Sequence, residues 1–301
     1  MFQLIKNPHL NFMGVRKYGY LFSGTLLVIA LLLIVFKGPK LGVDFSGGAL
    51  VWVKFEQPMD VGTIRKSLAN VGEALASIQK LSGTNEFVIR SSSRIDLNKF
   101  VDNVLGQLKK DFPDNPAELR SKETVEPKIS RELTRNTVYA VLLALALMGI
   151  YVWFRFDYRF GVCSAVSLFH DITITVGALV LTGREFTIPV IGALLTILGY
   201  SINDTIIVSD RVREDIKKMR SLPLKDVLNL AINETLSRTT LTVFTVIITL
   251  FCLFFFGGPV IADFAFTLIV GLIFGTYSST FVVCALVTDW EEKFPKKKSK
   301  K

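Results

Sequence analysis

Long stretches without charge divide this chain. Crossing a bilayer core of about 30 Å as a helix takes about 20 apolar residues. Six stretches are long enough, and together they contain only three ionisable side chains other than cysteine or tyrosine: 18–36, 136–154, 160–183, 186–209, 239–262 and 264–288. The pattern predicts six transmembrane helices. We expect the first of them to be a retained anchor and not a cleaved signal peptide, because Lys37-Gly38-Pro39-Lys40 follows where small residues would be needed.

The orientation of these helices follows from the basic residues in the short connections. The tail 1–17 holds Lys6, Arg16 and Lys17 without an acid, and the tail 289–301 ends in five lysines among six residues. The segment 210–238 holds seven bases against five acids. These counts predict that both termini lie in the cytoplasm, and we expect a multi-pass protein of the bacterial cytoplasmic (inner) membrane. We expect 210–238 to be a cytoplasmic amphipathic loop, with Val227, Leu228 and Ala231 on a helix that lies on the inner surface.

The segment 37–134, between the first two predicted spans, has the patterns of a folded extracytoplasmic domain. The run 49–55 has the pattern of a strand, with Leu50, Trp52 and Lys54 alternating with Val51, Val53 and Phe55. Asp60 precedes a helical pattern that ends near Val71. Two short strands are expected at 76–81 and 86–90, a second helix from Asp96, and a last strand at 122–129. The order β-α-β-β-α-β is that of a ferredoxin-like α+β unit. The predicted fold is therefore a six-helix membrane bundle with this domain inserted.

One acid lies inside the fourth predicted span. Asp204 is five to six residues from the expected inner end, and Ser201, three residues earlier, shares its helical face. Asn203 and Thr205 are its polar neighbours. Ionisable groups in hydrocarbon are costly and usually mark a pathway, a relay or a partner. Asp204 is therefore a candidate proton carrier, although it could instead bond a neighbouring helix or reach headgroup water.

Two further polar positions could join Asp204. Arg238, followed by Thr239 and Thr240, begins the fifth span on a neighbouring antiparallel helix, at about the depth of Asp204. Arg238 could exchange with a proton as the partner of Asp204, or it could extend to the membrane interface.

His170 and Asp171 lie near the middle of the third span. Adjacent helical residues point about 100° apart, so we expect no mutual pair between them. Either could meet Asp204 across the bundle or could have only a structural role.

Other motifs limit the possible functions. Gly271 and Gly275 form a G-x-x-x-G pattern, which is typical of close helix packing. The sequence contains no phosphate-binding G-x-x-x-x-G-K-[ST] loop and no H-E-x-x-H motif, and its three cysteines share no metal-ligand spacing. We therefore expect no enzymatic activity, no cofactor, no metal site and no nucleic-acid partner. Any work would be driven by a partner or by the membrane gradient.

Four segments resemble those of a known family, in its order and spacing. They are GVDFSGG (42–48), GYSINDTIIVSDRVR (199–213), AINETLSRTT (231–240) and GLIFGTYSS (271–279). With the six spans and the inserted domain, the chain resembles the SecF family of the resistance–nodulation–division superfamily. SecF proteins are the smaller half of the SecD–SecF accessory complex of the Sec preprotein translocase. Ser209 departs from the family pattern, which usually has Phe at the second position of the V-x-D-R motif (208–211 here).

The resemblance implies partners and a role. It implies that the chain pairs with SecD as a separate chain, associates with the SecYEG channel and uses the proton motive force to help draw out the emerging preprotein. It also implies that Asp204 and Arg238 take part in proton passage. Two alternatives remain: half of a small-molecule or lipid exporter of the same superfamily, and a structural partner of the channel that moves no protons.

Overall fold

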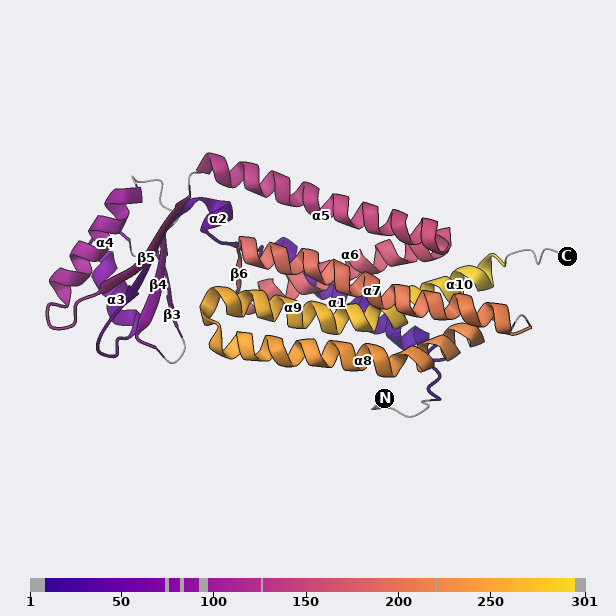
Figure 1. Cartoon of the computed structure of the whole chain (residues 1–301). Helices are drawn as coiled ribbons and strands as arrows, with labels where there is room; N and C mark the ends of the chain where they lie inside the picture. The colour runs from indigo at the N-terminus through magenta and orange to yellow at the C-terminus, as the bar shows by residue number, and fades with distance from the viewer. Residues whose placement is uncertain are drawn as a thin grey trace.

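A computed structural model describes residues 9–73, 76–81, 84–91, 97–125, 127–219 and 221–295. It has two parts, a long bundle of helices and a small α/β domain at one end of that bundle (Figure 1). The domain is formed by the chain between the first and second long helices. The predicted start of the second domain helix at Asp96 lies outside the described residues.

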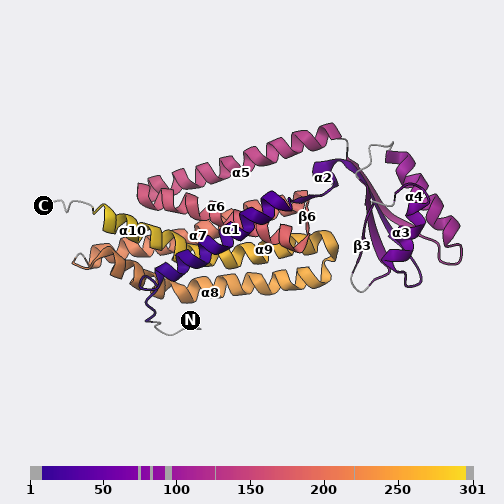
Figure 2. The same ribbon diagram turned by 180° about the vertical axis from the view of Figure 1, so that it is seen from behind.

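The bundle contains six helical segments that are long and apolar enough to cross a membrane. Its elements are α1 (Arg16–Phe36), α5 (Pro127–Arg155), α6 (Tyr158–Thr182), α7 (Ile188–Lys218), α8 (Leu224–Phe256) and α9 (Gly258–Ser278), which continues through a π-helical turn (Ser279–Cys284) into α10 (Ala285–Lys293). About half of the most apolar window is buried in α6 and α7, against 6% in α5 and 11% in α8. The centre of the bundle is therefore formed by α6 and α7 with α9, and α1 crosses one face of it obliquely (Figure 2).

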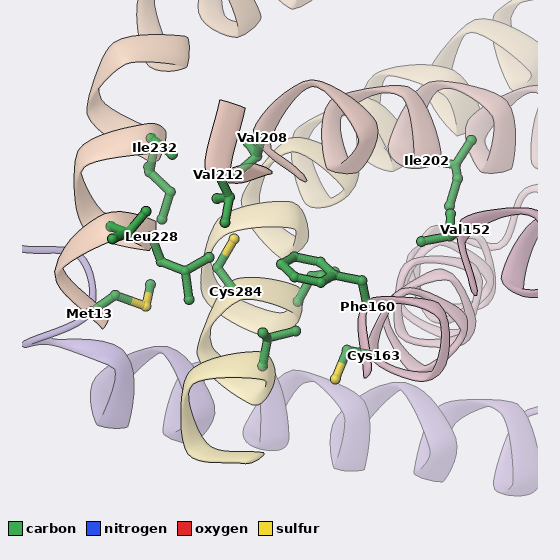
Figure 3. Packing of buried hydrophobic residues seen from close by; sticks show 14 of the residues in the cluster. Met13, Val152, Phe160, Cys163, Ile202, Val208, Val212, Leu228, Ile232 and Cys284 are labelled. Carbon is green, nitrogen blue, oxygen red and sulfur yellow. The ribbon is translucent and has the colours of Figure 1, made fainter. Parts of the chain in front are cut away.

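The segment 210–238, expected to be a cytoplasmic loop with an amphipathic helix on the inner surface, is mostly helical, but its apolar face does not lie on a membrane surface. Helix α7 continues to Lys218 and α8 begins at Leu224. The apolar residues Val227, Leu228 and Ala231 are fully buried inside the protein and do not face a membrane surface. Leu228 lies in a hydrophobic cluster with Met13, Val212 and Cys284 (Figure 3). The amphipathic pattern was real, but the apolar face packs against the rest of the bundle.

The N-terminal segment before α1 is part of this packing. The Asn233 side chain accepts a hydrogen bond from the backbone N–H of Leu10 (3.0 Å) and donates one to its carbonyl oxygen (2.9 Å). Met13 is fully buried, and the Thr288 hydroxyl lies 3.2 Å from its sulfur. This end of the bundle is therefore closed by contacts between α8, α10 and the segment before α1.

The α/β domain has the predicted order of elements. They are β2 (Gly48–Lys54), α3 (Val61–Ala69), β3 (Ser77–Lys80), β4 (Glu86–Ser91), α4 (Leu97–Asp111) and β5 (Glu118–Val125). The four strands form an antiparallel sheet in the order β3-β4-β2-β5. The strand expected at 122–129 begins earlier and ends at Val125, because Pro127 starts α5, and proline is favoured in the first turn of a helix.

The domain has a hydrophobic core of its own. Residues from β2, α3, β4 and α4 make up its fully buried centre: Val51, Val53, Phe55, Ile64, Leu68, Phe87, Ile89, Val104 and Leu108. Asp60 caps α3 by accepting a hydrogen bond from Gly62 N (2.7 Å). The Ser67 hydroxyl donates to the Asp111 carboxylate (2.6 Å) and joins α3 to α4, which lowers the pKa of Asp111. This link is present at neutral pH and is lost when acidification protonates Asp111.

The junction between domain and bundle is held by a buried acid just before α7. The short strands β1 (Lys40–Leu41) and β6 (Glu185–Phe186) pair in parallel. The Glu185 carboxylate lies 2.8 Å from Lys40 Nζ and 3.1 Å from Arg90 Nε in β4. The Arg90 and Glu185 side chains are only 9% and 7% exposed. The domain sheet is thus linked by a buried ion pair to the residues that lead into α7.

The glycine-rich segment at 42–48 fastens the same end of α7. The Asp44 carboxylate accepts a hydrogen bond from Ile188 N (3.0 Å), one of the backbone donors that a helix N-terminus leaves unpaired. Gly42 N donates to the Phe186 carbonyl oxygen (2.8 Å), and a Cβ at Gly42 would lie 2.9 Å from that oxygen. A side chain at Gly42 would therefore push β1 away from β6.

Replacing Arg90 with Met should loosen the domain from the bundle. The substitution removes the buried partner of Glu185 and leaves that carboxylate with the half-exposed Lys40, so it costs up to about 5 kcal/mol, the upper value for breaking a buried pair. Electron paramagnetic resonance between spin labels at Lys109 and Thr182, with the native cysteines replaced, should show a broader distance distribution in Arg90→Met. The control is Arg120→Met, since the ion pair of Arg120 with Glu118 is exposed. Equal distributions for the two variants would show that the Glu185 contact does not hold the domain.

Candidate functional site: a polar cluster inside the bundle

Asp204 lies on α7 and faces α9. Its side chain is buried, with 5% of the residue exposed. Its Oδ2 atom accepts a hydrogen bond from the Thr276 hydroxyl of α9 (3.1 Å). This is the single hydrogen bond that the structure gives the Asp204 carboxyl group among the described residues. Asp204 is therefore a buried acid with one neutral donor.

Two glycines bring α9 close enough for this contact. A Cβ at Gly271 would lie within 2.8 Å of three carbons of the Ile197 side chain. A Cβ at Gly275 would lie 3.1 Å from Ser201 Cβ. The predicted G-x-x-x-G packing is present, and it faces the helix that carries Asp204.

Asp171 on α6 is the centre of a second polar group. It is completely buried. Its Oδ2 atom accepts hydrogen bonds from the hydroxyls of Ser201 on α7 (2.6 Å) and Ser278 on α9 (2.8 Å). Its Oδ1 atom lies 2.9 Å from His170 Nδ1. The Asp171 carboxylate therefore joins the three central helices. Its partner Ser201 lies one helical turn from Asp204 on α7.

The expectation that His170 and Asp171 do not pair is wrong. Their Cβ atoms do point in different directions around α6. The side-chain torsions nevertheless turn the imidazole back toward the carboxylate, to 2.9 Å between Nδ1 and Oδ1. The 100° argument holds for Cβ directions but not for the ends of two multi-atom side chains.

The remainder of the His170 ring is enclosed. His170 is 2% exposed, and its Nε2 atom is buried without a hydrogen-bond partner among the described residues. The ring stacks against Tyr277 with 6.5 Å between centroids and 27° between planes. The Tyr277 hydroxyl donates to the Gly19 carbonyl oxygen of α1 (2.9 Å) and lies 3.1 Å from the Ser23 hydroxyl. The cluster thus extends from α6 through α9 to α1.

Arg238 does not join this cluster in the structure. Its side chain is exposed on α8, and none of the ion pairs among the described residues links it to Asp204. Thr235 and Thr239, one turn apart on α8, are buried, whereas Arg238 between them is exposed. Thr239 is buried, with a hydroxyl that has no partner among the described residues, and Thr240 is exposed.

The remaining predicted site residues, Asn203 and Thr205, differ in burial in the same way. Thr205 is buried beside Asp204, whereas Asn203 is exposed. The structure therefore brings together His170, Asp171 and Ser201, and places Asp204 one turn further along α7.

Sequence reasoning missed the contribution of α9 to the site. Thr276, Tyr277 and Ser278 directly follow Gly275, and all three contact the buried ionisable groups or their partners. The spacing of Gly271, Gly275 and Ser278 places them on one helical face, which could have indicated Ser278. The π-helical turn begins at Ser279, and such turns occur frequently at functional sites.

The cluster can hold and transfer protons, because its groups are carboxyls, an imidazole and hydroxyls inside a membrane-spanning bundle. No group of three or more His, Cys, Asp or Glu side chains that could bind a metal is found within the described part of the chain.

Six helices long and apolar enough to cross a membrane, packed with buried acids between them and joined to one small α/β domain, define a multi-pass membrane protein. The family model described as "Protein export membrane protein SecD/SecF, C-terminal" matches residues 105–293, and the "SecD/SecF GG Motif" matches residues 32–59. The chain belongs to the SecD/SecF family of protein export membrane proteins and matches its SecF members.

Relatives match this chain over nearly its whole length. The protein translocase subunit SecF of Calditerrivibrio nitroreducens is 40% identical over 290 residues, covering 95% of both chains. The protein translocase subunit SecDF of Thermus thermophilus is 41% identical over 300 residues, covering 95% of this chain and 39% of its own length. The crystal structure of SecDF, a translocon-associated membrane protein from Thermus thermophilus, superimposes with a TM-score of 0.84 at 40% identity, covering 95% of this chain. This chain spans 39% of that SecDF chain.

Replacing Gly271 with Ala should separate α9 from α7. Overpacking typically costs about 1–3 kcal/mol, and here all the near atoms belong to the branched side chain of Ile197. Thermal unfolding in detergent should show a midpoint lower by at least about 2 °C for Gly271→Ala. Gly199→Ala is the matched control, because its Cβ would meet nothing within 4 Å. An unchanged midpoint for Gly271→Ala would contradict the close α7–α9 packing.

Proposed function

We propose that this chain is a subunit that assists Sec-dependent protein translocation across the bacterial cytoplasmic membrane and couples it to the proton motive force. The observation that carries the proposal is Asp204, a buried carboxyl group inside the bundle of a protein-export family member. The Asp204 carboxyl group accepts one hydrogen bond, from the Thr276 hydroxyl, and can therefore take up and release a proton. Moving one charge through 100 mV is worth about 2.3 kcal/mol, so a few protons can drive a conformational cycle.

Asp204 suits this role better than Asp171. A buried carboxylate keeps its charge when several donors satisfy its oxygens. Asp171 has three such contacts, from Ser201, Ser278 and His170, whereas Asp204 has one, from Thr276. The hydrogen bonds of Asp204 therefore stabilise its charged form less than those of Asp171 do.

Arg238 enters the proposal in another state of the cycle. Its guanidinium is exposed on α8 in the described state, and α8 packs against α7. We place the contact between Arg238 and the ionised Asp204 in the state that follows proton release, when a positive partner stabilises the new charge. This requires α7 and α8 to turn relative to each other.

The proposed partners are SecD as a separate chain, the SecYEG channel and the emerging preprotein. The SecDF relative of Thermus thermophilus supports SecD as a partner, because its longer chain contains the part that this chain matches. We place both termini in the cytoplasm and the α/β domain on the far side, as the basic residues indicate. The sheet order β3-β4-β2-β5 supports a ferredoxin-like classification of that domain.

Two alternatives remain distinguishable. A small-molecule or lipid exporter of the same superfamily would need a larger pocket outside the membrane than 37–134 offers. A purely structural partner of the channel would not depend on the charge of Asp204.

Replacing Asp204 with Asn should abolish the gradient-dependent part of export. The amide has nearly the shape of the carboxyl group and can bond Thr276, but it carries no exchangeable charge. Export of a secreted reporter in cells that lack the native gene should fall to the level seen with an uncoupler. Asn203→Ala, at the exposed neighbour, is the matched control and should export normally. Full export by an inserted Asp204→Asn variant, with the gradient intact, would favour the structural alternative.

The charge at Arg238 is tested separately. Arg238→Lys should retain most gradient-dependent export and Arg238→Ala should lose at least half of it, because the proposal needs a cation and not a particular shape. The same reporter, compared at equal membrane levels of both variants, gives the measurement. If Arg238→Ala exports as well as the Lys variant, Arg238 has no part in the cycle.

A further inference from the structure

His170 has the geometry of a second proton-binding group. Its Nδ1 atom faces the Asp171 carboxylate at 2.9 Å, and its Nε2 atom is buried without a partner among the described residues. Buried polar atoms are nearly always paired, so an orphan needs an explanation. When Nδ1–H donates to a carboxylate, the other ring nitrogen keeps its lone pair and becomes the basic atom. An unpartnered Nε2 opposite such a bond is a place where a proton can bind.

The bonds around Asp171 support an ionised carboxylate beside this ring. Oδ2 accepts the hydroxyls of Ser201 and Ser278, at 2.6 and 2.8 Å. With Oδ2 occupied in this way, Oδ1 is available for the His170 Nδ1–H. A neutral His170 leaves the pair with one negative charge, and proton uptake at Nε2 produces an imidazolium–carboxylate pair without net charge.

The surroundings offer few competing charges. The titratable group that α9 presents to the ring is Tyr277, and α7 contributes Asp204, one turn beyond Ser201. Helix α1 packs on α6 with a stretch that is free of charge between Lys17 and Lys37, and α5 does so between Arg135 and Arg155. The π-helical turn contributes only Cys284.

The charged residues of α10 lie at the other end of α6. Arg159, in the first turn of α6, pairs with Glu291, whereas His170 lies three turns further along that helix. The proton state of His170 is thus governed mainly by Asp171.

We propose that His170 binds a proton at Nε2 and, with Asp171, forms a second protonatable unit that is linked through Ser201 to the helix of Asp204. The inference rests on the proposed proton-coupled function but makes a separate claim. Proton uptake there removes the net charge of the His170–Asp171 pair that Ser201 and Ser278 bond through Asp171, and these hydroxyls join α6 to α7 and α9. The state of His170 therefore affects how firmly α7 is held in the bundle.

Nuclear magnetic resonance of ¹⁵N-histidine tests the claim directly. The chain has two histidines, and His9 is exposed near the N-terminus, so a His9→Gln background leaves His170 alone. In lipid bilayers we expect a neutral ring with the proton on Nδ1, which converts to imidazolium as the pH is lowered from 9 to 5. Asp171→Asn should remove the preference for the Nδ1–H tautomer and the imidazolium signal. A ring that stays neutral over this range, or that carries its proton on Nε2, would overturn the proposal.

A functional variant separates proton binding from positioning. In His170→Asn the amide can still donate to Asp171, but no basic nitrogen remains. If His170 binds a transported proton, gradient-dependent export should fall at least fivefold in this variant. Full export would show that His170 only orients Asp171. Asp204→Asn should leave the His170 resonances titrating, so failure of this proposal and failure of the Asp204 proposal give different results.

Discussion

The burial of two carboxyl groups in a membrane-spanning bundle is the constraint on which the rest of the structure depends. A carboxylate in this setting must find donors inside the protein, because the surrounding hydrocarbon supplies none. Asp171 finds them on three helices, and Asp204 reaches Thr276 on α9. These short contacts require α7 and α9 to approach closely, and Gly271 and Gly275 permit that approach. The glycines are therefore part of the polar site as much as of the packing.

Helix α7 connects this site to the domain outside the membrane. The backbone N–H of Ile188, the first residue of α7, donates a hydrogen bond to Asp44. Glu185, three residues before α7, pairs with Arg90 of the domain sheet. The same helix carries Ser201 and Asp204 and continues as one piece to Lys218. Because an unbroken helix moves as a rigid element, a change in the bonds of Ser201 or Asp204 reaches the domain through Glu185 and Asp44. This gives the proposed proton cycle a mechanical route.

The sequence predicted six long apolar helices and the order of elements in the domain, because both depend on local patterns. Uncharged stretches show membrane helices directly, and alternation around Val51 and Val53 shows a strand with one face in a core. It failed where the answer depends on the surrounding fold. The apolar face with Leu228 fits a membrane surface as well as a protein core. The His170–Asp171 pair depends on side-chain torsions, and the outward direction of Arg238 depends on which face of α8 is buried.

The proposed cycle requires that Asp204 is protonated and deprotonated within the working range of pH. Infrared difference spectroscopy of the protein in lipid bilayers measures this most directly, because a protonated carboxyl group has a carbonyl stretch that the carboxylate lacks. We expect a carbonyl band that grows as the pH falls, shifts in heavy water and disappears in Asp204→Asn. A band that survives that substitution unchanged, or the absence of any pH-dependent carboxyl band, would contradict it.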